Sequence, residues 1–146
     1  MKILWTDGSA SPNPVPGGFA VILEQPDGSG VPVVLGRDDN TTNIRMEGSA
    51  MIAAIKYAGE DGCEIHSDSE FWINVLTKWA PMWQANGWKK KTGSIMNLDL
   101  VQELYDLYCK YSVELVWVRG HVGNELNELA DEWANRARKG AKVPEV

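Results

Sequence analysis

The apolar run Ile3-Leu4-Trp5-Thr6 stops at Asp7-Gly8-Ser9, which has the composition of a turn. We therefore predict a short strand that ends at Asp7. Two more β-rich runs follow, separated by a Pro- and Gly-rich loop and a tight turn. Because such short connections join neighbouring strands, the three runs predict an antiparallel meander. The second and third strands are expected at 19–25 and 31–35, the loop at 11–18 and the turn at 26–30, with Pro32 favouring an edge position.

The pattern changes after residue 44. Apolar residues then recur at steps of three and four, which is typical of helices, and these helices alternate with two short β-rich runs. Alternation of this kind implies parallel strands joined by crossover helices. We therefore predict an α/β fold: a five-stranded mixed sheet, part antiparallel meander and part parallel, with helices on both faces. The expected helices cover 45–58, 69–78, a short stretch from Pro81, 97–111 and 124–139, and the expected strands cover 63–67 and 113–118, the last one buried because it is apolar apart from Glu114.

The composition is that of one globular domain. The chain has 146 residues, of which 44% are hydrophobic and 23% charged, and its apolar runs are too short to span a membrane. We assign residues 1–140 to a single domain and 141–146 to a short tail. Cys63 and Cys109 form no metal-binding cluster and indicate a reducing compartment, so we expect a cytoplasmic protein. The formal net charge of −6 argues against a nucleic-acid partner unless the charges are unevenly distributed.

Four acidic residues, Asp7, Glu47, Asp68 and Asp131, stand beside the ends or apolar faces of predicted elements. Each also has a local explanation. Asp7 suits a turn, and Asp68 suits a helix cap. Glu47 suits the positive end of a helix, and Asp131 suits a solvated helix face. However, parallel strands present their carboxyl ends at one edge of a sheet, where ligands bind.

Four carboxylates that converge at one place would repel one another and raise each other's pKa. Divalent cations remove that penalty, and oxygen ligands alone suit hard ions such as Mg²⁺ or Mn²⁺. Two such ions about 4 Å apart are a known device for cleaving phosphate esters. The sequence therefore favours a metal-dependent phosphoesterase.

Short motifs along nearly the whole chain carry a resemblance to a known family. They are Thr6-Asp7-Gly8-Ser9, Asn13-Pro14 with Pro16-Gly17-Gly18, Thr41-Thr42-Asn43 with Arg45-Met46-Glu47, Ser67-Asp68-Ser69, Trp88-Lys89, Asn97-Leu98-Asp99-Leu100, Val118-Arg119-Gly120-His121-Val122-Gly123-Asn124-Glu125, and Asn127-Glu128 with Asp131. In this order and at this spacing, the chain resembles ribonuclease H of the type-one, bacterial-like class. The resemblance implies the ribonuclease H-like fold and one catalytic domain over 1–140.

The resemblance implies that Asp7, Glu47, Asp68 and Asp131 are the catalytic carboxylates and hold two Mg²⁺ ions, with Mn²⁺ as the other candidate. It also implies that His121, in a loop before the last helix, assists proton transfer or product release. We expect an endonuclease that hydrolyses the RNA strand of RNA–DNA hybrids and leaves 5′-phosphate and 3′-hydroxyl ends. We expect it to be a monomer that does not associate with a membrane.

The resemblance also implies a set of residues that bind the hybrid. The segment Lys78–Lys91 carries four Lys and no acid, so it matches the basic protrusion that holds the DNA strand in this family. An amphipathic helix with buried tryptophans is the simpler alternative. RNA is told from DNA by its 2′-hydroxyls, which backbone groups and Asn side chains can bind. The implied substrate-binding residues are Gly8, Ser9, Asn13, Thr42, Asn43, Glu70, Trp79, Lys89 and Asn97.

The chain departs from the family pattern at a few positions. Glu70 stands where many relatives carry Gln, Val15 replaces a usual Gly, and Ile44 replaces a usual Asn. Gly48 follows Glu47 within a predicted helix, where a glycine costs under about 1 kcal/mol. None of these positions is a predicted metal ligand.

Three other functions remain open. A resolvase, integrase or transposase domain on the same fold would cleave DNA, and such domains typically show three acids. A non-catalytic hybrid-binding module would lack a carboxylate. The chain could also be the ribonuclease H part of a reverse transcriptase. A comparison of hybrid, duplex DNA and duplex RNA as substrates separates the first two from a ribonuclease H.

Overall fold

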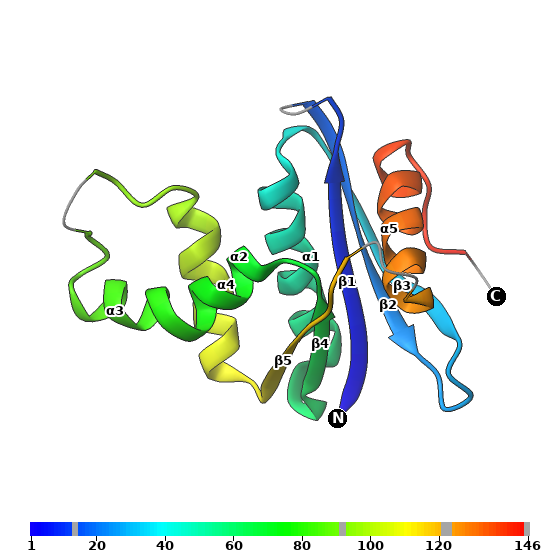
Figure 1. The fold of residues 1–146 in the computed structure, drawn as a ribbon, viewed down its shortest axis with the longest axis horizontal. Helices are drawn as coiled ribbons and strands as arrows, with labels where there is room; N and C mark the ends of the chain where they lie inside the picture. The colour runs from blue at the N-terminus through cyan, green and yellow to red at the C-terminus, as the bar shows by residue number, and fades with distance from the viewer. Residues whose placement is uncertain (13–14, 91–92, 121–123, 145–146) are drawn as a thin grey trace.

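A computed structural model describes residues 1–12, 15–90, 93–120 and 124–144. Its centre is a five-stranded sheet in the order β3-β2-β1-β4-β5 (Figure 1). The pairs β1–β2 and β2–β3 are antiparallel, whereas β1–β4 and β4–β5 are parallel. The predicted mixed sheet is therefore confirmed. The strands are β1 (Lys2–Ala10), β2 (Val15–Glu24), β3 (Gly30–Thr41), β4 (Cys63–Ser67) and β5 (Val113–Trp117).

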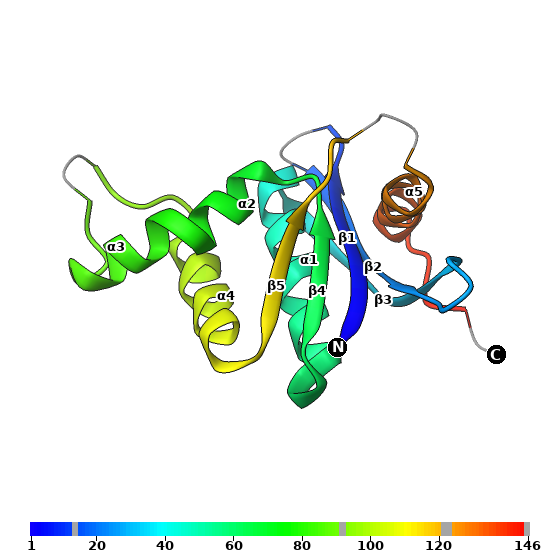
Figure 2. The same cartoon turned by 60° about the horizontal axis from the view of Figure 1, so that its bottom comes forward.

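Helices cover both faces of the sheet, as predicted (Figure 2). On one face lie α1 (Asn43–Ala58) and α4 (Leu98–Lys110), which pack against each other. On the other face lies α5 (Glu125–Arg138), which packs on β1, β2 and β3. In the described part of the chain, none of the helices has both the length and the apolar character that a membrane span requires.

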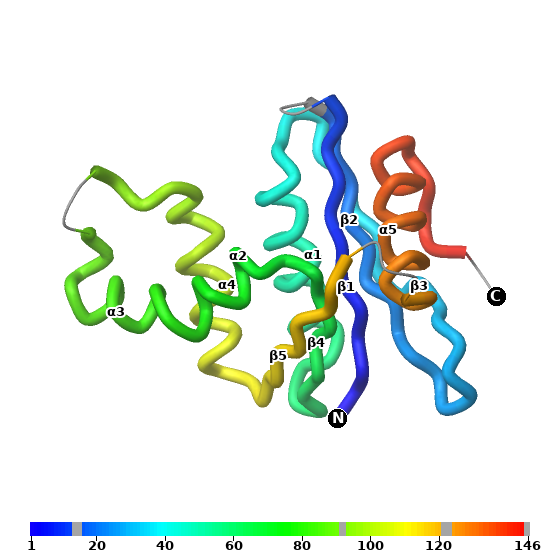
Figure 3. Tube along the Cα trace, in the orientation of Figure 1, coloured from blue at the N-terminus to red at the C-terminus, as the bar shows by residue number. Residues whose placement is uncertain are grey.

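A helical segment leads away from the sheet after β4 (Figure 3). It consists of α2, one π-helical turn and α3, so the two helices predicted here form a nearly continuous rod. We call residues 70–97 the arm. Its helical pieces are α2 (Glu70–Asn74), the π-helical turn Val75–Trp79 and α3 (Ala80–Ala85), and a 3₁₀ turn at Gly59–Asp61 precedes β4.

Each face of the sheet has its own hydrophobic core. The larger core, between the sheet and α1 with α4, contains Leu4, Ile65 and Leu104 among its buried residues. The smaller core, under α5, contains Trp5 and Ala130. Neighbouring residues of β1 point to opposite faces because side chains alternate along a strand. This alternation fixes which helix each β1 side chain faces.

The predicted end of the first strand at Asp7 is wrong. β1 continues to Ala10, because β2 starts at Val15 and pairs with it as far as Ala10 opposite Gly17. The predicted loop over 11–18 is correspondingly shorter, and β3 extends beyond the predicted 31–35. The parallel pairing of β1 with β4, however, stops at Trp5. Asp7 therefore does lie just past the parallel part of the sheet, although it is not at a strand end.

The predicted burial of the last strand is also wrong. β5 is an edge strand, and its residues are half-buried or exposed. Val113 and Leu115 pack against the larger core, whereas Trp117 is 47% exposed. An apolar run can belong to a central strand, or to an edge strand that packs one face against a core, and the sequence alone did not tell these two cases apart.

Candidate metal centre

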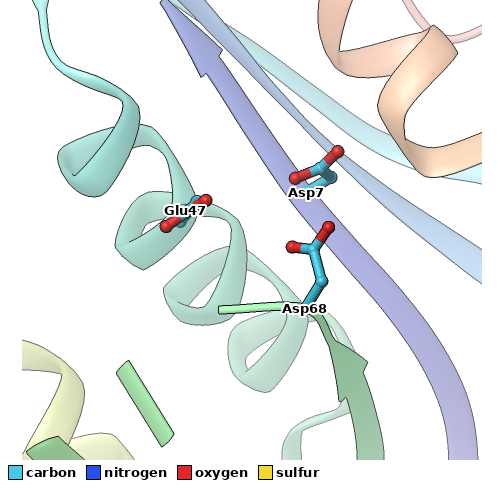
Figure 4. Close-up of side chains that lie close together, drawn as sticks. All are labelled: Asp7, Glu47 and Asp68. Carbon is cyan, nitrogen blue, oxygen red and sulfur yellow. The ribbon is translucent and has the colours of Figure 1, made fainter. Parts of the chain in front are cut away.

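Three of the predicted carboxylates come together at one end of the parallel strands (Figure 4). Asp7 comes from β1, Glu47 from α1, and Asp68 directly follows β4. One oxygen of each lies within 4.8 Å of the others. Asp7 is buried, at 6% exposure, and the other two are half-buried. Such a group of hard oxygen donors fits Mg²⁺ or Mn²⁺.

Gly8 explains how β1 and α1 approach so closely. A Cβ atom on Gly8 would lie 2.3 Å from the backbone nitrogen of Glu47 and 2.3 Å from the carbonyl carbon of Met46. No side chain fits there, because the neighbouring atoms are backbone and cannot turn aside. The missing side chain therefore brings Glu47 beside Asp7.

Gly120 plays a similar part next to Asp68. A Cβ atom on Gly120 would lie 2.8 Å from Oδ2 of Asp68 and 3.4 Å from its Cβ. Sequence reasoning quoted Gly120 within a family motif but gave it no role. Gly120 thus lies directly against the Asp68 carboxylate, and a side chain at this position would require that carboxylate to shift.

Burial and mutual repulsion raise the pKa values of these carboxylates. Loss of solvent is the main cause of raising the pKa of Asp7 to about 9, and repulsion from Asp68 adds to it. The pKa of Glu47 rises to about 7, again mainly through burial, although a hydrogen bond from Ser69 works in the opposite direction. The apo site is therefore destabilised by its own charges, and a divalent cation would relieve both causes.

Asp131 lies close to this group but outside it. Its charge raises the pKa of Asp7, so α5 brings it near the other three, and its role as a metal ligand stays a prediction. Among the described residues, however, only Asp7, Glu47 and Asp68 have carboxylate oxygens that all lie within 4.8 Å of one another. Asn135 ties this part of α5 to β1: its Oδ1 accepts from Ser9 Oγ at 2.8 Å, and its Nδ2 donates to the Asp131 carbonyl at 3.1 Å.

The family of this chain follows from a comparison of its whole sequence. A family model described as RNase H matches residues 1–139, which include all four carboxylates. The chain belongs to the ribonuclease H family.

Known ribonucleases H are similar over almost the whole chain. Ribonuclease H of Methylorubrum extorquens strain PA1 is 39% identical over 140 residues; the match covers 95% of this chain but 60% of that protein. Ribonuclease H of Granulibacter bethesdensis is 40% identical, with 92% of this chain and 90% of that protein covered. The crystal structure of LC9-RNase H1, described as a type 1 RNase H with the type 2 active-site motif, has a TM-score of 0.77 at 31% identity and covers 95% of this chain and 72% of that chain.

The helix cap that was the local alternative explanation of Asp68 is made by the next residue. Ser69 caps α2 instead, because its Oγ accepts from the Trp72 backbone nitrogen at 3.3 Å. The Ser69 side chain also forms a hydrogen bond with Glu47, which lowers the pKa of that carboxyl. Ser69 is a supporting residue that sequence reasoning missed.

Several predicted hybrid-binding residues make hydrogen bonds within the protein. Thr42 caps α1, its Oγ1 accepting from the Arg45 backbone nitrogen at 3.2 Å. Asn43 Oδ1 accepts from the Ala10 backbone nitrogen at 2.5 Å. Asn97 Oδ1 accepts from the Arg45 guanidinium at 3.2 Å. These contacts fix the chain around the start of α1, and the role of these side chains on a hybrid stays a prediction.

The other predicted hybrid-binding residues lie on or beside the arm. Glu70 is exposed at the first position of α2, next to the metal centre in sequence. Trp79, at 37% exposure, and the exposed Lys89 line a groove of about 560 Å³ together with Phe71 and Trp83. None of the three clustered carboxylates lines this groove. Gly8 and Ser9 are placed by β1, whereas the predicted residues Asn13 and His121 lie outside the described part of the chain.

Without divalent cations, this ribonuclease H should become less stable as the pH rises. The ordinary pKa values of Asp7 and Glu47 are 3.8 and 4.5, and the folded values are about 9 and about 7. Between these limits the unfolded chain releases protons that the folded chain keeps, so the free energy of unfolding falls with pH. We expect the melting temperature in chelator to drop from about pH 5 to pH 9, with Mg²⁺ giving an increasing recovery. If Mg²⁺ raised the melting temperature by the same amount at every pH from about 5 to 9, the assignment of Asp7 and Glu47 to a metal centre would be contradicted.

Proposed function

We propose that Asp7, Glu47, Asp68 and Asp131 hold two divalent metal ions with which the enzyme hydrolyses the RNA strand of an RNA–DNA hybrid. The observation that carries this proposal is the meeting of three carboxylates from three separate elements, with raised pKa values and Asp131 nearby. Membership of the ribonuclease H family makes the enzyme an endonuclease that acts on hybrids. Mg²⁺ is the proposed ion, because the three clustered carboxylates offer oxygen donors.

The chemistry requires one water molecule, one phosphodiester and no covalent intermediate. The metal ions would lower the pKa of the attacking water and offset the charge on the departing 3′ oxygen. The new bond joins the water oxygen to phosphorus while the bond to the 3′ oxygen breaks, which leaves 5′-phosphate and 3′-hydroxyl ends. The protein supplies rigid, largely desolvated carboxylates whose charges are set in place before the reaction. His121 is proposed to move a proton or to assist product release.

The arm is proposed to hold the DNA strand. The sequence from 71 to 98 contains Lys78, Lys89, Lys90 and Lys91 but no Asp or Glu. Lys89 and Lys90 line the groove beside Trp79. A cationic groove with aromatic rings suits a polyanion that carries sugars and flat bases.

Replacing both Lys89 and Lys90 by Ala should weaken hybrid binding without slowing the chemical step. Each phosphate contact that is lost removes about 1 from the slope of binding against salt, so this slope should fall by about 2. The kcat at saturating hybrid should stay unchanged. Fluorescence anisotropy over a series of salt concentrations measures the slope. The Lys110→Ala/Lys139→Ala variant removes two exposed charges outside the arm and serves as the control; an equal loss in the control would contradict a role for the arm.

The experiment that tests the function is cleavage of a labelled RNA–DNA hybrid, beside duplex DNA and duplex RNA, with Mg²⁺ or with chelator. The RNA strand of the hybrid should be cut only when Mg²⁺ is present. Cutting of duplex DNA instead would favour a resolvase or integrase, and binding without cutting would favour a non-catalytic module. We also propose that the enzyme is a monomer of the cytoplasm, in keeping with the free Cys63 and Cys109 thiols.

A further inference from the structure

Trp72 connects the two chain segments that carry Glu47 and Asp68. Its side chain is completely buried, at 0% exposure. The indole nitrogen donates to the Ile44 carbonyl in the first turn of α1 at 2.7 Å. The backbone nitrogen donates to Ser69 Oγ at 3.3 Å. One residue of α2 is thus bonded both to α1 and to the residue that directly follows Asp68.

Gly48 makes room for the Trp72 ring. A Cβ atom on Gly48 would lie 2.6 Å from Cζ2 and 2.8 Å from Cε2 of Trp72. A glycine within a helix costs about 1 kcal/mol relative to alanine. The packing of the Trp72 ring against Gly48 offsets this loss of helix stability. Gly48 directly follows Glu47, and the ring therefore lies against the backbone that carries this carboxylate.

The hydrogen bonds around Ser69 have a direction. A serine hydroxyl has one proton to donate and lone pairs to accept. Because Ser69 Oγ accepts from the Trp72 backbone nitrogen, its single proton remains for the Glu47 carboxylate, to which it is hydrogen-bonded. Trp72 thus acts on Glu47 by two routes, through the ring on Gly48 and through the Ser69 hydroxyl.

We propose that Trp72, seated on Gly48, is a positioning residue that sets the spacing of the Glu47 and Asp68 carboxylates and thereby the affinity of the centre for divalent metal. The inference rests on the proposed metal-dependent function. Trp72 touches neither substrate nor metal, since it is fully buried within the larger core. Its effect is that of a supporting residue, and loss of such support typically weakens metal binding by about 10- to 100-fold.

The test measures Mn²⁺ binding to the protein alone, by the paramagnetic resonance of the free ion. Mn²⁺ has the same preference for oxygen ligands as Mg²⁺. Trp72→Phe keeps an aromatic ring but loses the indole N–H, and it should bind Mn²⁺ at least about tenfold more weakly. Leu104→Ala is the matched control, because it opens a cavity in the same core on α4 and should lower the melting temperature without changing Mn²⁺ affinity beyond about twofold.

A second variant tests the same contact from the other side. Gly48→Ala should also weaken Mn²⁺ binding, because its new methyl group meets the ring. The double variant Gly48→Ala/Trp72→Phe should bind Mn²⁺ at least as tightly as Trp72→Phe alone, since the smaller ring leaves space for the methyl group. A merely structural role would not give this recovery.

The outcomes separate this inference from the proposed function. If the natural chain binds Mn²⁺ and Trp72→Phe and Gly48→Ala bind it equally well, the positioning role is overturned and the metal centre stands. If the natural chain binds no Mn²⁺ and does not cleave hybrid in its presence, the proposed function is overturned together with the positioning role. Weaker binding by both variants, with the control unchanged, supports the inference.

Discussion

Replacing Asp7 by Asn should abolish cleavage of the hybrid while the protein becomes more stable in the absence of metal. Asp7 is the most deeply buried of the three clustered carboxylates, at 6% exposure. An amide has nearly the same shape but no charge, so the centre loses a charged ligand. The product from labelled RNA should fall below detection at a concentration of Mg²⁺ that saturates the natural chain.

The same substitution removes a buried carboxyl whose ionisation the fold disfavours. Since the pKa of Asp7 is 3.8 in its ordinary state and about 9 in the folded chain, folding without metal near neutral pH requires Asp7 to keep a proton that the unfolded chain releases, and this lowers the stability of the fold. In chelator, Asp7→Asn should therefore melt at least about 5 °C above the natural chain near pH 8. Asp27→Asn, at an exposed turn, is the control and should change neither activity nor this comparison. Cleavage by Asp7→Asn would refute the assignment of the centre.

Replacing Gly8 by Ala should cost both activity and stability. The new methyl group would lie 2.3 Å from backbone atoms of Met46 and Glu47. Relief of that contact requires β1 and α1 to separate, which carries Glu47 away from Asp7. Overpacking of this kind costs about 1–3 kcal/mol, and we expect chemical denaturation to show a loss within or above that range. We also expect cleavage to fall by about a hundredfold, because the carboxylates no longer share their ions.

A second glycine provides the matched control for Gly8→Ala. Gly28, in the turn between β2 and β3, has a φ of +87° and no atom within 4 Å of the position of a Cβ. Gly28→Ala should lose about 1–2 kcal/mol through backbone strain alone and keep full activity. If Gly8→Ala retained the activity of Gly28→Ala, the close approach of β1 and α1 would not govern the metal centre.

The parts of the fold that depend on local pattern could be predicted from the sequence. Helical periodicity located α1, α4 and α5, and the order of the elements predicted the mixed sheet. The turn signal at Asp7-Gly8-Ser9 misled, because Gly8 is required for the contact with α1 rather than for a turn. A glycine selected for close packing looks the same in a sequence as one selected for a turn.

For the candidate site, the sequence pointed to the carboxylates that meet but not to the residues that support them. Acidic residues near element ends, with the family motifs, pointed to the carboxylates that the structure brings together. The cap at Ser69, the ring of Trp72 on Gly48 and the contact of Gly120 with Asp68 depend on residues that meet only in the folded chain. Sequence spacing has no information about such contacts, so the geometry had to come from the structure.

The charge of the arm has a consequence for the way in which a nucleic acid arrives. Because the arm carries four Lys against one acid, Glu70, the rest of the chain is more negative than the net charge of −6 indicates. If the arm binds the DNA strand as proposed, a duplex in free diffusion is repelled by the rest of the enzyme and attracted by the arm, so encounters are expected to begin at the arm. A hybrid that is too short to reach from the arm to the carboxylates would therefore gain no binding at the carboxylates from the attraction of the arm. It would be repelled by the negative charge around them.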